Sequence, residues 1–186
     1  MAETRENVGV AWGKILMFRT KEDDMTATRD SVLVVDSPIG SLTLTVQSGA
    51  VTAVDFGAQD GHEPGERTNA VLAEAARQLA AYFAGELRDF DLPLRASGTP
   101  FQLQVWRGLQ AIPYGETISY SELAKRIGRP TAARAVGRAS GQNPIAVVVP
   151  CHRVIGADGT LTGYAGGLDA KAALLALEAP RQKEAR

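Results

Sequence analysis

The only cysteine of the 186-residue sequence, Cys151, is followed directly by His152 and Arg153. A cysteine reacts as its thiolate, and its ordinary pKa of about 8.5 must be lowered by a proton acceptor or a positive charge nearby. His152 is the natural base. Because neighbouring side chains in extended backbone point to opposite sides, either the chain bends after Cys151 or a water molecule connects the two groups. The motif favours a nucleophilic cysteine over one that only fills space in the core.

A carboxylate that could complete such a site lies further along the chain. Glu178 stands near the end of an apolar segment, residues 170–179, which predicts a last helix with Asp169 as its N-cap. From there Glu178 could orient His152 and stabilise its protonated form, as in other relays of a nucleophile, a base and an acid. An exposed position on the helix surface is the open alternative for this residue.

The segment before Cys151 must present the thiol. Residues 145–149 read Ile-Ala-Val-Val-Val and lie between Pro144 and Pro150. Such a run of β-branched residues predicts a short buried strand. Because proline cannot donate to a strand ladder, we expect Pro150 to end the pairing and to place Cys151 at the end of the strand.

Residues 30–96 predict a small supporting domain, because they combine no nucleophile, base and ligand groups. Alternating apolar residues separated by glycine-containing turns indicate an antiparallel meander, and an alanine- and leucine-rich stretch with helical spacing follows. The elements expected, in chain order, are strands at 32–35, 42–46 and 51–56, a loop at 59–69, a helix at 70–83 and an edge strand at 90–94.

Residues 97–180 predict a second, mostly helical domain. Thr99 can cap a helix whose first turn holds Pro100. Two short helices should follow, each after a capping residue, at 120–127 after Ser119 and at 132–139 after Thr131. Two short helices joined by a tight turn with a glycine are typical of a helix-turn-helix. The fold class expected for the whole chain is therefore α/β, in the α+β arrangement.

The second helix of this pair combines small residues with two arginines that lie four positions apart and share a face. These residues are Ala133, Arg134, Ala135, Gly137 and Arg138. Residues 100–180 carry 8 Lys+Arg against 5 Asp+Glu, whereas residues 1–99 carry 9 against 15. A polyanion is attracted to the positive half, so we interpret the slim, basic helix as facing phosphates.

The composition, 45% hydrophobic and 22% charged, is that of an ordinary soluble protein. One cysteine excludes an internal disulfide, and the sequence has neither a long apolar span nor a signal-peptide pattern. We therefore expect a cytoplasmic protein without membrane contact. Residues 1–29 predict a poorly ordered extension, and residues 181–186 form a tail. Met25 stands just ahead of the first patterned segment, so translation could start at Met1 or at Met25.

Taken together, the ordered motifs resemble the O6-alkylguanine-DNA alkyltransferases, also called methylated-DNA–protein-cysteine methyltransferases. The resemblance spans residues 97–179, and the region from Ser31 is more loosely similar to the ribonuclease-H-like domain of that family. The motifs are PYGET at 113–117, ARAVG at 133–137, Asn143-Pro144, PCHRV at 150–154, GYAGG at 163–167 and LLALE at 174–178.

The resemblance implies catalytic roles for five residues. Cys151 would take the alkyl group from O6 of guanine by in-line displacement. His152 would act through water as its base, and Glu178 would orient His152. Asn143 would form the hinge turn between the DNA-binding helix and the reactive segment. Tyr120 would press on the phosphate of the target nucleotide and help to protonate the departing guanine.

The resemblance also implies how the substrate is held. The helix with Arg134 would enter the minor groove, and this arginine would replace the flipped base in the stack. Residues 161–167 form a glycine-rich loop without a phosphate-binding fingerprint, which favours close approach to a flat ligand. In it, Tyr164 would wall the pocket. The backbone around Val154 and Ala165 would read the edge of the guanine, and Gly166 would also line the pocket.

The expected partner is double-stranded DNA with O6-alkylguanine, and O4-alkylthymine is a further candidate substrate. Because S-alkylcysteine is a stable thioether, we expect one turnover per molecule and no cofactor. We also expect a monomer, with cooperative assembly on DNA as an open alternative. No structural zinc site is expected, since His62 is the only other histidine. The alternatives are a non-catalytic binder of alkylated DNA, a cysteine hydrolase with turnover, and a helix-turn-helix regulator.

Overall fold

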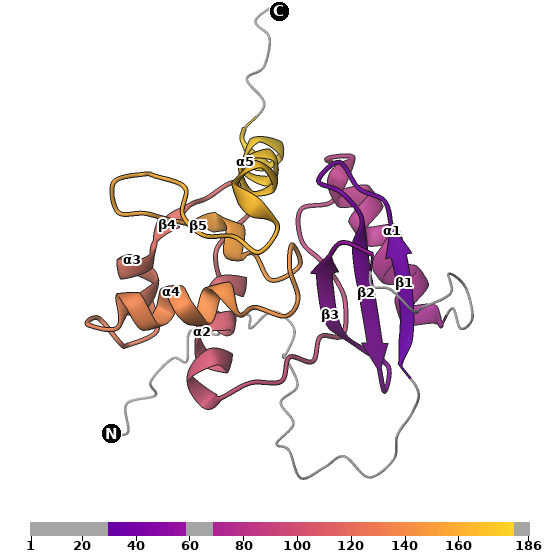
Figure 1. The fold of residues 1–186 in the computed structure, drawn as a ribbon, viewed down its shortest axis with the longest axis horizontal. Helices are drawn as coiled ribbons and strands as arrows, with labels where there is room; N and C mark the ends of the chain where they lie inside the picture. The colour runs from indigo at the N-terminus through magenta and orange to yellow at the C-terminus, as the bar shows by residue number, and fades with distance from the viewer. Residues whose placement is uncertain (1–29, 59–68, 181–186) are drawn as a thin grey trace, which may run out of the picture.

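The computed structural model describes residues 30–58 and 69–180. The N-terminal domain is an antiparallel sheet with strands in the order β1 (Ser31–Val35), β2 (Leu42–Gln47) and β3 (Ala50–Phe56), accompanied by α1 (Ala70–Phe83) (Figure 1). The predicted meander and helix are confirmed. The extension at 1–29, nearly all of the loop expected at 59–69, and the tail lie outside the described residues.

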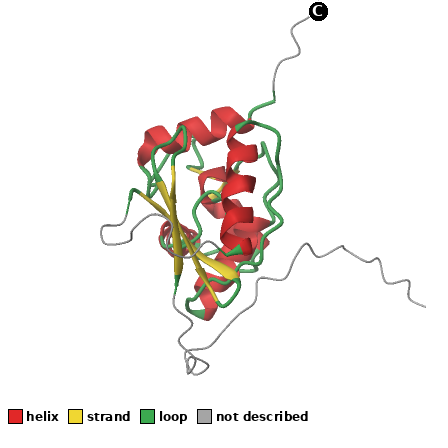
Figure 2. Ribbon diagram, turned by 90° about the vertical axis from the view of Figure 1, so that its right-hand side faces the viewer, coloured by secondary structure: helices red, strands yellow, loops and turns green. Residues whose placement is uncertain are grey.

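Alternation and capping explain this domain. Leu42, Leu44 and Val46 lie on one face of β2 and are buried, and the three strands twist relative to one another (Figure 2). The helix α1 begins where the side chain of Asn69 accepts a 2.8 Å hydrogen bond from the backbone of Leu72. The buried side of α1 then covers the sheet.

The edge strand predicted at 90–94 is wrong. Only Leu94 contributes an isolated parallel bridge, to Val51. The backbone of Val51 donates to Pro93 and accepts from Arg95, at 2.8 and 2.9 Å. Because Pro93 has no N–H group of its own, the ladder does not extend beyond this contact.

The C-terminal domain is mostly helical and contains two short parallel-paired strands. Its elements are α2 (Pro100–Gln110), β4 (Ile118–Ser119), α3 (Tyr120–Arg126), α4 (Ala133–Gly141), the 3-10 turn η1 (Cys151–Arg153), β5 (Val154–Ile155) and α5 (Gly167–Glu178). In Figure 1 these helices lie beside the sheet and α1. The predicted fold class is confirmed.

Two of the four predicted caps in this domain are wrong. Thr99 and Ser119 cap α2 and α3 through their side chains, as expected. The helix α4, in contrast, starts after Ala132, and α5 starts after Gly166, and neither has a side-chain cap. Asp169 instead lies in the first turn of α5, where a carboxylate is stabilised by the positive end of the helix dipole.

The strand predicted at 145–149 is also wrong. These residues are buried but form successive turns, with hydrogen bonds from Val148 to Ala146 and from Val149 to Ile145. Val147 even adopts a φ of 67°, which is rare for a β-branched residue. The apolar run predicted burial correctly, but apart from a single bridge between Ile145 and Val54 the segment bonds within itself and forms no strand.

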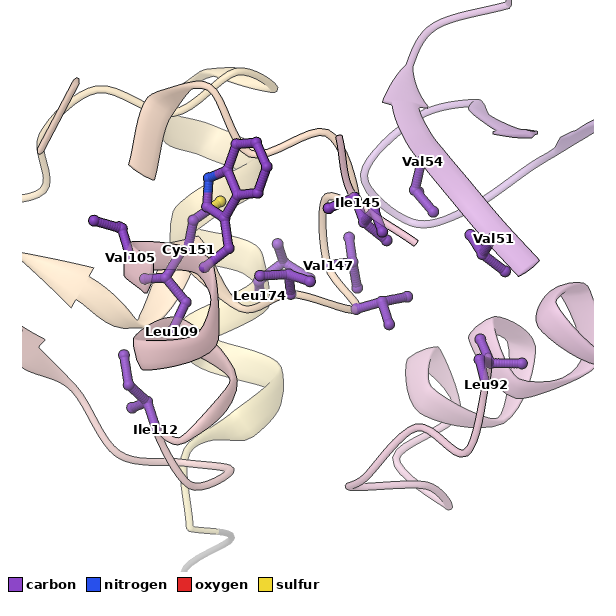
Figure 3. Packing of buried hydrophobic residues seen from close by; sticks show 14 of the residues in the cluster. Val51, Val54, Leu92, Val105, Leu109, Ile112, Ile145, Val147, Cys151 and Leu174 are labelled. Atoms are coloured by element: carbon purple, nitrogen blue, oxygen red, sulfur yellow. The ribbon is translucent and has the colours of Figure 1, made fainter. Parts of the chain in front are cut away.

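This turning segment joins the two domains. The amide of Val54 in β3 donates to Pro144 at 2.9 Å, and its carbonyl accepts from Ala146 at 3.1 Å. Val51 and Val54 face Ile145 and Val147 across the boundary, and Cys151 lies further into the second domain (Figure 3). One continuous apolar core therefore supports the segment that carries the cysteine.

Candidate active site

Cys151 begins η1, directly after Pro150, and is 9% exposed. The chain thus bends at the cysteine, which is one of the two arrangements that the sequence left open. The Nδ2 atom of Asn143 lies 3.4 Å from Sγ of Cys151 and donates toward it. A donor aimed at sulfur favours the thiolate over the thiol.

Asn143 also shapes the backbone that leads to the cysteine. Its Nδ2 donates to the carbonyl of Val149 at 2.8 Å, and its Oδ1 accepts from the amide of Ile145 at 3.1 Å. One side chain therefore spans both ends of the turning segment and reaches the sulfur. This geometry is that of a hinge turn between α4 and η1.

Burial raises the pKa of the Cys151 thiol, while the hydrogen bond from Asn143 and the positive charge of Lys171 lower it. For His152, burial lowers the pKa, and the hydrogen bond to Glu178 raises it. Both effects of burial favour uncharged groups. The resting pair is therefore thiol and neutral imidazole, and the thiolate must form when the base accepts a proton.

His152 is fully buried, and its Nε2 lies 3.0 Å from Oε1 of Glu178. Its other ring nitrogen, Nδ1, is buried and has no hydrogen-bond partner among the described residues. When Nε2 carries its proton toward Glu178, Nδ1 is the atom left to accept one. The structure thus brings His152 and Glu178 into direct contact.

Glu178 is 3% exposed, so the alternative of a surface position is wrong. Burial by itself would raise the pKa of Glu178, but hydrogen bonds from His152 and Arg153 hold it well below the usual range. Arg153 binds both carboxylate oxygens, each at 2.8 Å. The amide of Gly115 donates to Oε2 at 3.2 Å, and the hydroxyl of Tyr82 donates to Oε1 at 2.7 Å.

Sequence reasoning missed three buried polar residues of this site: Arg153, Lys171 and Tyr82. Lys171 is fully buried and donates to the carbonyls of Val154 and Thr162, at 2.6 and 2.9 Å. Only the position of Arg153, next to the cysteine and histidine, gave a signal. Charged side chains are usually exposed, so the burial of Arg153 and Lys171 depends on partners distant in sequence. The spacing along α1 predicts the burial of the Tyr82 ring but not its bond to Glu178.

A small pocket opens beside the sulfur. Its lining residues come from the end of α4, the hinge turn and the glycine-rich loop, and they include Asn143, Cys151, Gly163, Tyr164 and Ala165. The pocket measures about 10 Å³, which is room for roughly one water molecule. The hydroxyl of Tyr164 is buried and has no partner among the described residues. In this conformation the pocket therefore has no room for a ligand larger than water.

A wider groove of about 570 Å³ continues from this pocket toward α4. Tyr120 at the start of α3 lies along it, and Gly137 lies close enough for a Cβ to meet the Tyr120 ring at 3.5 Å. Thr162 of the glycine-rich loop donates to the Tyr120 hydroxyl at 3.3 Å. On α4 itself, Arg134 and Arg138 are exposed.

The other two predicted pocket residues, Val154 and Gly166, do not line the small pocket or the groove. Val154 is buried in β5, and Gly166 ends the glycine-rich loop against the Phe56 ring. Within residues 30–58 and 69–180, no group of three or more His, Cys, Asp and Glu side chains could hold a metal ion, and His62 lies outside these ranges. In the same part of the chain, every helix is too short or too polar to span a membrane.

Known proteins match both domains. The model of the 6-O-methylguanine DNA methyltransferase ribonuclease-like domain matches residues 33–96, and that of the DNA-binding domain of the same proteins matches residues 100–180. A methylated-DNA–protein-cysteine methyltransferase of Mycolicibacterium paratuberculosis is 58% identical over 149 residues, covering 77% of this chain and 89% of that protein. One from Methanosarcina acetivorans is 52% identical, covering 78% and 96%.

A solved structure agrees with these matches. The crystal structure of Mycobacterium tuberculosis OGT in complex with DNA is similar with a TM-score of 0.72 and 52% identity, and the match covers 81% of this chain and 95% of that one. The family models together span most of the sequence, and the relatives match over nearly their whole length. This chain therefore belongs to the 6-O-methylguanine DNA methyltransferase family.

Proposed function

We propose that this protein repairs O6-methylguanine in duplex DNA by moving the methyl group to Sγ of its own Cys151. Methylated-DNA–protein-cysteine methyltransferase activity and DNA binding follow from membership of the family. The assignment of the acceptor to Cys151 is carried by one observation: it is the only cysteine, and it lies in the pocket between the hinge turn and the glycine-rich loop.

The proton of the thiol goes to His152. A water molecule that bridges Sγ and Nδ1 transfers it, which gives a thiolate and an imidazolium ion. Glu178 stabilises the positive charge through its 3.0 Å contact with Nε2. Asn143 supports the thiolate from the other side, through the donor 3.4 Å from sulfur. The imidazolium ion and the thiolate are thus each stabilised by a neighbouring side chain.

The thiolate then attacks the methyl carbon in line with the C–O6 bond. The new S–C bond forms as the C–O6 bond breaks, and the departing guanine accepts a proton from the hydroxyl of Tyr120. Water then returns a proton to Tyr120 and takes the proton that His152 received from the thiol. The product on Cys151 is a thioether, which has no bond as labile as that of a thioester. The protein therefore acts once.

The target base must leave the duplex, because the buried sulfur cannot reach a stacked nucleotide. The small residues of α4, Ala133, Ala135 and Gly137, allow close approach to a minor groove, and Arg134 fills the space that the base vacates. Arg138 adds a phosphate contact. The groove from α4 to the pocket is the path of the flipped nucleotide.

In the pocket the guanine lies against Tyr164. Backbone groups of Val154, Ala165 and Gly166 contact its edge. Since the pocket holds about 10 Å³ before binding, the glycine-rich loop must open to admit the base. An O4-alkylthymine could follow the same path.

We further propose that the protein is cytoplasmic and monomeric, with cooperative assembly on DNA as the alternative.

The experiment that tests this function is intact-protein mass spectrometry after mixing with excess duplex that contains one O6-methylguanine. We expect one methyl group per chain, located on Cys151, and none on the Cys151→Ser variant. A second methyl, or methylation of the variant, would disprove the assignment.

Three other outcomes would point to the alternatives. Preferential binding to the lesion without a change of mass indicates a non-catalytic binder of alkylated DNA. Repeated release of product from an ester or amide indicates a cysteine hydrolase with turnover. Binding to one DNA sequence regardless of alkylation indicates a regulator.

A further inference from the structure

The N-terminal domain reaches into the active site through one side chain. Tyr82, in the last turns of α1, is fully buried, and its hydroxyl donates a 2.7 Å hydrogen bond to Oε1 of Glu178. The two residues are 96 positions apart in sequence. No other described residue of the N-terminal domain hydrogen-bonds to Glu178 or His152.

The ring of Tyr82 is held in place from several sides. Phe83 and Phe90 lie with ring centroids 5.4 and 5.2 Å away, and Tyr114 lies 6.2 Å away at an interplanar angle of 83°. Such contacts between aromatic rings fix orientation as well as burying area. The hydroxyl therefore points at the carboxylate as a preset donor.

The Tyr82 hydroxyl shares its acceptor oxygen, Oε1 of Glu178, with two other donors. Oε1 of Glu178 accepts from Tyr82, from His152 and from Arg153, at 2.7, 3.0 and 2.8 Å. Each donor draws electron density from that oxygen and weakens it as an acceptor for the others. The bond from Tyr82 thus limits how strongly Glu178 can hold a proton on His152.

We infer that Tyr82 is a positioning residue of the transfer reaction, which fixes the Glu178 carboxylate and keeps His152 a ready proton acceptor. This inference rests on the proposed function, in which neutral His152 takes the proton of Cys151. It gives the ribonuclease-like domain a direct part in the chemistry, through hydrogen bonding rather than through packing alone.

The electrostatic surroundings of His152 agree with this role. Burial lowers the pKa of His152, the contact with Glu178 raises it, and the positive charges of Arg153 and Lys171 lower it. With Tyr82 removed from Oε1, the influence of Glu178 grows and the pKa of His152 rises. The groups that face His152 or Glu178 from all neighbouring elements are Tyr82 of α1, the Gly115 amide before β4, Cys151 and Arg153 of η1, Tyr164 of the glycine-rich loop and Lys171 of α5.

The test is the Tyr82→Phe variant, which keeps the ring and removes only the hydroxyl. Transfer of methyl from an O6-methylguanine duplex is measured in single-turnover experiments across pH. Because His152 must be neutral to accept a proton, the rate rises with pH as His152 loses its proton. In Tyr82→Phe we expect this rise to occur at a pH higher by about half a unit or more. Duplex affinity and the final stoichiometry of one methyl should stay unchanged.

Tyr114→Phe is the matched control. Tyr114 belongs to the same aromatic cluster, but its hydroxyl donates to the backbone carbonyl of Leu177 and not to Glu178. The transfer rate of Tyr114→Phe should rise with pH over the same range as that of the wild type. An equal shift in both variants, or no shift in Tyr82→Phe, would overturn the inference.

A direct titration of His152 by NMR distinguishes a change in the pKa of His152 from a loss of folding. The chain has two histidines, so a His62→Gln background leaves one imidazole signal. In that background Tyr82→Phe should raise the pKa of His152 at a temperature where both proteins are folded, and an unchanged pKa would contradict the inference. Failure of wild-type Cys151 to gain a methyl would instead contradict the proposed function.

Discussion

Lys171 donates a 2.6 Å hydrogen bond from its ammonium group to the carbonyl oxygen of Val154, in the strand that follows the reactive turn. A second bond, to Thr162, connects the same lysine to the glycine-rich loop. Burial lowers the pKa of Lys171, whereas the proximity of Cys151 raises it. One buried cation thus holds β5 and the loop together beneath the proposed guanine pocket.

Lys171→Met should therefore destabilise the protein and slow transfer. The variant keeps the apolar length of the side chain but loses a charge-assisted hydrogen bond to Val154, which is worth about 1.5–3 kcal/mol. Thermal unfolding and single-turnover rates measure the two effects. Lys125→Met, at an exposed position on α3, is the control and should leave the melting temperature nearly unchanged.

Glu178→Gln should slow methyl transfer by about tenfold or more, because the imidazolium form of His152 loses its stabilising charge. Duplex affinity should remain, since Glu178 lies in the interior and not on α4. Transfer rates at saturating duplex, together with binding isotherms, test both parts. Glu116→Gln changes an exposed carboxylate and should behave like the wild type, and a normal rate in Glu178→Gln would contradict the relay.

The same carboxylate predicts how stability depends on pH. The folded pKa of Glu178 lies well below the ordinary value of 4.5, so its ionised form contributes stability above that pH. This contribution is lost as pH falls below about 4.5, when the unfolded chain takes up the proton first. Between about pH 5 and 3, the melting temperature of the wild type should fall more steeply than that of Glu178→Gln. Parallel curves would show that folding does not lower the pKa of Glu178, and so would contradict the buried ionised carboxylate.

Arg134→Ala should weaken duplex binding by about tenfold and reduce base flipping, because the exposed arginine on α4 contacts DNA in the proposed complex. Fluorescence of a 2-aminopurine placed at the target position reports flipping, and anisotropy reports binding. Arg77→Ala is a suitable control, since Arg77 is exposed on α1 and pairs with Glu74. Undiminished binding and flipping would remove Arg134 from its proposed role.

Gly166→Ala should lower stability, because a Cβ at Gly166 would clash with the Phe56 ring. Overpacking of this kind costs about 1–3 kcal/mol. Gly163→Ala is the control for the melting temperature, as a Cβ there meets nothing within 4 Å. In a Phe56→Ala background the cost of Gly166→Ala should largely disappear, and full additivity of the two changes would contradict the contact.

Prediction from the sequence worked best where local chemistry decides the structure. Thr99 and Ser119 cap helices as their side chains suggest, and the spacing of apolar residues predicted the sheet and α1. The contact between His152 and Glu178 was expected from the ordered motifs and not from spacing alone.

Prediction was poorer where distant partners decide. Residues 145–149 have the composition of a strand, yet they bond within their own segment and to Val54. Lys171 resembles an ordinary helical surface residue. Tyr82 lies on the apolar face of α1, so helical spacing predicts the burial of its ring, but only the packing of α1 against α5 shows its bond to Glu178. A single sequence carries no local signal for such contacts.

Val54 donates a backbone hydrogen bond to Pro144 and accepts one from Ala146, and these two bonds limit how far the two domains can be treated as separate modules. Two separate family models describe its halves, which invites the exchange of one half between relatives. A chimera that keeps both halves intact must still pair β3 correctly with residues 144–146. The unit that can be transplanted therefore includes residues from both domains. Engineers who graft a new N-terminal half should choose the donor by its match at Val54 rather than by overall identity.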